Sequence, residues 1–175
     1  MLPRFCLHTQ DFREHAAGGN DPAQIERWSA FFGPTYWHLH HYCWGLMKTN
    51  RAMLLVRNVD FKRSYLADAI KEFDYVIERA PADFVLLPEI LTKKGENLVR
   101  LGRGPHALLE FERAAELKPD YWPPYAQLSD YYKSSGDIAK AREQLRRGLS
   151  FAPDATALQR RLSELDRPEG RSISR

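Results

Sequence analysis

The amino-acid sequence predicts an all-α fold, an α-solenoid in which antiparallel helix pairs follow one another along the chain. Two observations support this prediction. A set of small, large and turn-forming residues recurs about every 34 residues. Glycine and proline also alternate in that pattern, where helices are expected to end. The chain has 175 residues, of which 43% are hydrophobic and 28% charged, which suffices for one domain with a core.

The repeat is visible when the chain is compared with itself. A shift of 34 residues superposes Gly102 on Gly136, Ala107 on Ala141, Arg113 on Arg147, Pro119 on Pro153 and Asp120 on Asp154. A shift of 38 residues adds a third copy, with Ala69 on Ala107 and Pro81 on Pro119. The glycines tolerate the left-handed conformation that ends a helix, the alanines let two helices approach closely, and the prolines end the second helix.

Large residues complete the pattern, since Phe111 and Leu145 follow the alanines by one helical turn. Together these residues resemble the tetratricopeptide repeat family, whose mark is a large residue, a glycine turn, and then Ala, Phe and Pro at fixed offsets. The resemblance covers roughly residues 35 to 154. It implies a right-handed superhelix in which the first helices of successive pairs line a concave groove for an extended peptide or a partner helix.

Three segments are expected: an irregular extension over 1–33 with one short helix at 22–32, a repeat domain over 34–166, and a disordered polar tail over 167–175. Within the domain, three helix pairs are expected at about 35–80, 84–117 and 122–151, with a capping helix at 155–166 that Asp154 opens. The separate helices are expected at 35–56 and 62–79, 84–101 and 105–117, and 122–134 and 137–151.

The first pair departs from the family pattern. If Trp37 takes the large-residue position, Ala69 arrives about 16 residues too late for a standard repeat. The first helix or the loop after it is therefore expected to be extended. Such a departure is either the site of a specific function or an atypical N-terminal cap.

A histidine-rich segment lies in that first helix. His38 and His41 share one helical face, as do His40 and Cys43. Imidazole and thiolate are ligands for zinc, copper or haem iron, so a metal- or haem-binding helical protein is the alternative hypothesis. The other interpretation is that these histidines are packed and hydrogen-bonded among aromatic residues, and no cofactor is then required.

Two cysteines, Cys6 and Cys43, permit one disulfide. If the protein is exported, the bridge pins the N-terminal segment onto the first long helix. In the other interpretation Cys43 is a small buried hydrophobic residue.

The leading hypothesis is a non-enzymatic scaffold or adaptor that binds a protein segment in the groove. By position in the family pattern, the groove residues are Glu89, Thr92, Glu96, Val99, Arg100, Ala126, Asp130, Lys133 and Ser134. The alternative for each of them is an ordinary solvated position. Family members that grip acidic chaperone C-termini use lysine, arginine and asparagine at these sites. Because Glu96 and Asp130 would repel a carboxylate, a basic or mixed ligand is expected.

Other function classes are disfavoured. No glycine-rich phosphate loop or serine elbow is present, so neither catalysis nor a cofactor is expected. The 26 Lys and Arg are mixed with 23 Asp and Glu, which disfavours nucleic acid. Apolar runs such as 84–87 are far shorter than the roughly 20 residues of a membrane span.

No signal peptide is expected after Met1. The compartment stays open: it is cytoplasmic by default, or periplasmic or secreted if a signal peptide was removed. The oligomeric state also stays open.

Overall fold

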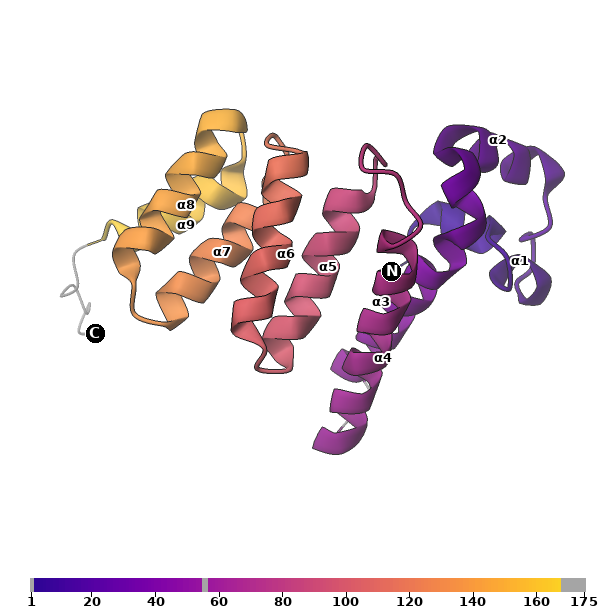
Figure 1. Cartoon of the computed structure of the whole chain (residues 1–175), viewed down its shortest axis with the longest axis horizontal. Helices are drawn as coiled ribbons and strands as arrows, with labels where there is room; N and C mark the ends of the chain where they lie inside the picture. Colours follow the sequence, from indigo (N-terminus) through magenta and orange to yellow (C-terminus); the bar gives the residue numbers. More distant parts are fainter. Residues whose placement is uncertain (1, 55–56, 168–175) are drawn as a thin grey trace, which may run out of the picture. The chain divides into compact units, whose positions relative to one another are not determined.

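The computed structural model describes residues 2–54 and 57–167, which are helical with short turns and contain no strand (Figure 1). The chain divides into two compact units, residues 1–110 and 111–175. The boundary falls inside helix α6 (Gly104–Leu117), so this helix begins in the first unit and ends in the second.

The N-terminal extension is folded, which corrects the expectation of an irregular segment. It contains the 3-10 helices η1 (Arg4–His8) and η2 (Gly33–His38) and the α-helices α1 (Phe12–His15) and α2 (Pro22–Phe32). Helix α2 begins after Asp21, whose Oδ1 accepts hydrogen bonds from the backbone N–H groups of Ala23 and Gln24. Pro22 follows in the first turn, where its missing N–H costs nothing.

Side-chain contacts hold this extension in place. Cys6 and Cys43 form a disulfide, with their Cα atoms 5.7 Å apart, that joins η1 to helix α3 (Leu39–Leu54). The ring of Phe5 lies 4.9 Å from that of Phe32, edge to face. The hydroxyl of Tyr36 donates a hydrogen bond to the backbone carbonyl of His8, 28 residues earlier. A sequence pattern does not reveal such distant contacts, which is why the segment was expected to be irregular.

The first helix pair consists of α3 and α4 (Val59–Ile77). Helix α3 begins four residues later than expected because residues 33–38 form η2. Helix α4 begins three residues earlier because the side chain of Asn58 caps it, accepting from the N–H groups of Asp60 and Phe61. Trp37, the residue considered for the large-residue position of this pair, lies in η2 before α3 begins and is 48% exposed.

The second pair consists of α5 (Leu87–Arg100) and α6. Gly102 has φ +75°, and the N–H of Arg103 donates to the carbonyl of Leu98 at 2.9 Å. The third pair repeats this turn 34 residues later, where Gly136 has φ +82° and the N–H of Asp137 donates to Tyr132 at 2.9 Å. The two turns are the same glycine-terminated helix end, which is the physical basis of the sequence repeat.

The second unit contains the third pair, α7 (Pro123–Ser134) and α8 (Ile138–Phe151), followed by α9 (Thr156–Leu165). The N-cap of α9 is Ala155 and makes no side-chain cap bond, so the expectation that Asp154 opens this helix is wrong. Helix α9 packs instead through apolar residues against the third pair. The buried core cluster of this unit comprises Ala115, Tyr125, Ala126, Leu145, Ala155 and Leu158. Of the tail expected to be disordered, residues 168–175 lie outside the described residues.

Candidate interaction surface

The predicted groove residues of α5 are spaced at three and four residues, which places them along one side of that helix. They do not share one environment. Thr92 is 1% exposed and its hydroxyl donates to the carbonyl of Pro88 at 2.7 Å. The expectation that Thr92 contacts a ligand is therefore wrong, because its side chain already bonds within the buried turn below the surface.

The exposed part of this side of α5 is a small charged network with one apolar side chain. The carboxylate of Glu96 lies 3.1 Å from Nζ of Lys93 and 3.5 Å from Nη2 of Arg100. Arg100 also donates to Oδ1 of Asn97 at 3.0 Å. Val99 is 41% exposed beside them. These interactions hold the charged groups in fixed positions and leave the network with one more cation than anion.

Helix α3 contributes side chains next to α5 that sequence reasoning missed. The hydroxyl of Tyr42 donates to Oε1 of Glu89 at 2.7 Å, so this predicted groove residue is half-buried and engaged. The amide Nδ2 of Asn97 donates to Oγ1 of Thr49 at 2.7 Å. Because the first pair departs from the repeat spacing, the sequence does not show which residues of α3 lie beside α5. The contacts of Tyr42 and Thr49 with α5 were therefore not predicted.

In the second unit the predicted groove residues again divide into buried and exposed ones. Ala126 is 2% exposed in the core cluster, so the expectation that it lines the groove is wrong. Asp130 accepts two hydrogen bonds from the guanidinium of Arg161, at 3.3 and 3.1 Å. Ser134 is exposed and its hydroxyl donates to the carbonyl of Tyr131. Lys133 is exposed as well.

A shallow groove of about 200 Å³ lies between α7 and α9. Its lining residues are Ser129, Asp130, Lys133, Arg160, Arg161, Glu164 and Leu165. Three of these side chains are cationic and two anionic, so the groove carries a mixed charge with a small basic excess. Asp130 and Lys133 on its α7 side belong to the predicted groove residues, whereas the sequence predicts α9 only as a capping helix and assigns it no binding residue.

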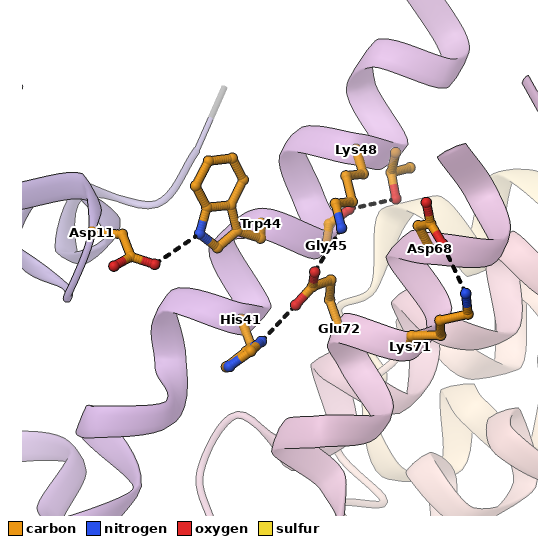
Figure 2. Close-up of polar contacts among 9 residues, drawn as sticks. Asp11, His41, Trp44, Gly45, Lys48, Asp68, Lys71 and Glu72 are labelled. Atoms are coloured by element: carbon orange, nitrogen blue, oxygen red, sulfur yellow. Dashed lines mark hydrogen bonds and ion pairs between the residues drawn. The ribbon is translucent and has the colours of Figure 1, made fainter. Parts of the chain in front are cut away.

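The histidine-rich segment forms a different kind of site (Figure 2). Nδ1 of His41 donates to Oε2 of Glu72 at 2.5 Å, and Nζ of Lys48 donates to Oε1 of the same carboxylate at 2.6 Å. The ring of His41 stacks on Tyr75, with centroids 3.7 Å apart. The guanidinium carbon of Arg79 also lies over the Tyr75 ring, 3.6 Å from its centroid. The arrangement ties α3 to α4.

These neighbours shift several pKa values. Burial opposes ionisation of Glu72, but the hydrogen bonds from Lys48 and His41 outweigh it and hold the pKa of Glu72 below its ordinary value. Burial lowers the pKa of His38, helped by the charge of Arg79. Burial also lowers the pKa of His40, helped by His41. Both shifts favour the neutral form of the imidazole ring.

The metal- or haem-binding hypothesis does not fit this geometry. The sulfur of Cys43 is bonded to Cys6, so it is no thiolate ligand. His41 uses Nδ1 on Glu72, and His38 packs edge-on against Tyr75. Across residues 2–54 and 57–167, no group of three or more His, Cys, Asp or Glu is arranged to hold a metal ion. The segment is a packed aromatic and ionic cluster, which was the other interpretation of the sequence.

Comparisons with known proteins agree with the repeat architecture. No family model matches the chain. Over 107 residues it is 29% identical to the Hsp70-Hsp90 organizing protein of Triticum aestivum, a match that covers 61% of this chain and 18% of that protein. Over 117 residues it is 25% identical to the protein O-mannosyl-transferase TMTC1 of Mus musculus, covering 67% of this chain and 12% of that protein. The chain thus spans less than a fifth of the length of either relative.

The described helices follow one another in pairs, which is the all-α repeat architecture that the sequence predicts. Among solved structures the chain is similar to the first tetratricopeptide repeat domain of Spaghetti (RPAP3) bound to the HSP90 peptide SRMEEVD, with a TM-score of 0.49 and 17% identity, covering 70% of this chain and 90% of that one. None of the helices in the described part of the chain is long and apolar enough to cross a membrane.

Proposed function

We propose that this chain is a non-enzymatic adaptor that binds a protein segment, either an extended peptide or a partner helix, on the first-helix faces of its repeats. The observation that carries the proposal is the network on α5, where Lys93, Glu96 and Arg100 are held in position around the exposed Val99. Pre-positioned charges next to an exposed apolar side chain are a feature of protein recognition surfaces, since less side-chain entropy is lost on binding.

The charges define the expected ligand. Asp130 forms an ion pair with Arg161, and Glu96 forms ion pairs with Lys93 and Arg100. Each face then carries a small basic excess and keeps acidic groups in contact with the ligand. We therefore expect a segment of mixed charge with an apolar residue for Val99. A segment of mixed charge can place cations near Glu96 and Asp130 and anions near the basic groups. A strongly acidic segment such as SRMEEVD relies mainly on the basic groups, so it is expected to bind less tightly than a matched segment of mixed charge.

A selected peptide tests this proposal. Peptides from a random displayed library are selected on the full chain, and the affinity of the best one is measured by fluorescence anisotropy, with SRMEEVD as the acidic comparison. Changing Glu96, Arg100, Asp130 and Lys133 together to alanine is expected to weaken binding about tenfold or more. The matched control changes Asp68, Lys71, Glu143 and Arg146 to alanine and removes the same charges from α4 and α8.

The two variants decide the assignment together. Loss of affinity in the first variant with little change in the control supports the faces of α5 and α7. Undiminished binding by the first variant contradicts the proposal, as does tighter binding of SRMEEVD than of every mixed-charge peptide.

A further inference from the structure

The first helix pair is longer than α5 at the end where α3 stops and α4 begins. Helix α3 has 16 residues and α4 has 19, whereas α5 has 14. The additional length places the start of α4 beyond the end of α5 (Figure 1). We call the described residues 51–54 and 57–63 the hairpin end.

Large apolar side chains are exposed on the hairpin end. Met53 is 50% exposed, Leu54 82%, Val59 66% and Phe61 64%. Single exposed apolar residues are ordinary, but four within eleven described residues form a cluster that calls for an apolar environment. The packing of the pair does not require them, since buried residues such as Ala52 and Leu66 already supply its core here.

The hairpin end also carries basic side chains. The hairpin end contains Arg51, Arg57, Lys62 and Arg63, and its single acidic residue is Asp60. Its formal charge of +3 equals that of the entire chain. A segment that combines exposed apolar and basic side chains is complementary to a surface that is anionic outside and apolar beneath.

A groove beside the hairpin end shows the same combination. Val59, Lys62, Arg63 and Leu66 are spaced at three and four residues and share one face of α4. Together with Arg100, Leu101 and Gly102 at the end of α5, they line a groove of about 380 Å³. Its lining is apolar at three positions and cationic at three, with no carboxylate, which suits an anionic group attached to an apolar body.

We propose that the hairpin end docks on an anionic lipid surface. The apolar side chains enter the interfacial layer of the bilayer, and the cations contact lipid phosphates. A lipid surface fits this projection better than a protein partner does, because a bilayer deforms around a protruding tip and needs no preformed cavity. The docking is peripheral and independent of peptide binding on α5 and α7, although Arg100 borders both sites.

Vesicle co-sedimentation of the full chain tests the proposal. Vesicles of phosphatidylcholine alone are compared with vesicles that also contain phosphatidylglycerol, at low and high salt. We expect binding to the anionic vesicles that salt weakens. The variants Leu54→Ser/Phe61→Ser and Lys62→Glu/Arg63→Glu are each expected to reduce that binding about tenfold or more. Both leave Arg100 intact, so peptide affinity reports separately on the proposed groove function.

Matched controls place equivalent changes elsewhere. Val85→Ser/Leu109→Ser removes exposed apolar side chains, and Lys71→Glu/Lys118→Glu reverses exposed charges. The changed residues are exposed except Lys62, which is half-buried, and circular dichroism verifies that each variant stays folded. Three results would overturn the proposal: no binding to anionic vesicles, equal loss in the controls, or hairpin-end variants that abolish self-association of the chain while vesicle binding persists.

Discussion

Gly45 of α3 lies directly against the ring of Phe73 on α4. A Cβ atom at position 45 would be 2.4 Å from Cε1 and 2.7 Å from Cδ1 of that ring. Both residues are buried, and Phe73 is fully enclosed. The missing side chain of Gly45 therefore determines how closely the first helix pair can pack.

Replacing Gly45 with alanine is expected to destabilise the protein by about 1–3 kcal/mol, because the added methyl group overlaps a ring that cannot move within a full core. Chemical denaturation of the variant measures this loss. The double change Gly45→Ala/Phe73→Leu is expected to recover part of it relative to the sum of the two single changes. Alanine at the exposed Ser64 is the control, and an equally stable Gly45→Ala variant would contradict the close approach.

The disulfide is expected to stabilise the N-terminal extension. Cys6 and Cys43 are 37 residues apart, and closing a loop of that length is worth about 3–4 kcal/mol in the chain-entropy description. The double variant Cys6→Ser/Cys43→Ser should lower the free energy of unfolding by a similar amount. Hydrogen exchange should accelerate mainly over residues 4–32. Unchanged exchange there, in the variant or after reduction of the natural chain, would show that the extension is held without the bridge.

Lys94 joins two carboxylates within the first unit. Its Nζ lies 2.7 Å from Oδ1 of Asp74 and 2.7 Å from Oε1 of Glu110. Burial opposes its charge, but these two hydrogen bonds prevail and raise the pKa of Lys94. Replacement by methionine leaves two partly buried carboxylates without their cation.

We expect Lys94→Met to lower the free energy of unfolding by about 2–4 kcal/mol in denaturant titrations near neutral pH. Lys71→Met is the control, because Lys71 pairs with Asp68 at 3.0 Å on the surface and its side chain is 78% exposed. That change should cost less than about 0.5 kcal/mol. Similar losses in both variants would contradict the role of Lys94.

The histidine cluster should make stability fall in mild acid. Because the pKa values of His38 and His40 are lowered in the folded state, the unfolded chain takes up protons first as the pH decreases. The stability from keeping both rings neutral is fully present above the ordinary histidine pKa of 6.5 and is lost as the pH falls through the lower folded values.

Denaturant titrations from pH 8 to pH 5 measure this loss. The double variant His38→Gln/His40→Gln is expected to flatten the pH dependence over that range, whereas His106→Gln, at an exposed position, should leave it intact. A slope that persists in the double variant would assign the titration to other groups.

The sequence predicted the fold where the repeat depends on local backbone chemistry. Gly102 and Gly136 end helices through the same turn, and Ala107 and Ala141 are fully buried at the equivalent contacts. The first pair could not be aligned in the same way. The close contact between its two helices is made at Gly45, which is not part of the repeat pattern. The additional helical length also places Ala69 later in the chain than the repeat spacing predicts.

The family pattern predicts positions for the candidate site, but it does not predict the environment of each side chain. The family pattern places Thr92 and Ala126 on the groove side, yet both lie below the surface because neighbouring helices cover them. In the sequence Asp130 has no evident partner, but in the structure it pairs with Arg161, 31 residues later. Such partners depend on tertiary packing, which a single sequence does not show.

Chemical-shift mapping with the selected peptide tests the central claim most directly. The uniformly ¹⁵N-labelled chain is titrated with that peptide, and the backbone amide shifts are followed by two-dimensional NMR. We expect the largest changes at residues 96–100 and 130–134, on the first helices of the second and third pairs. Changes confined to residues 68–71 and 143–146, on the second helices, would contradict the account.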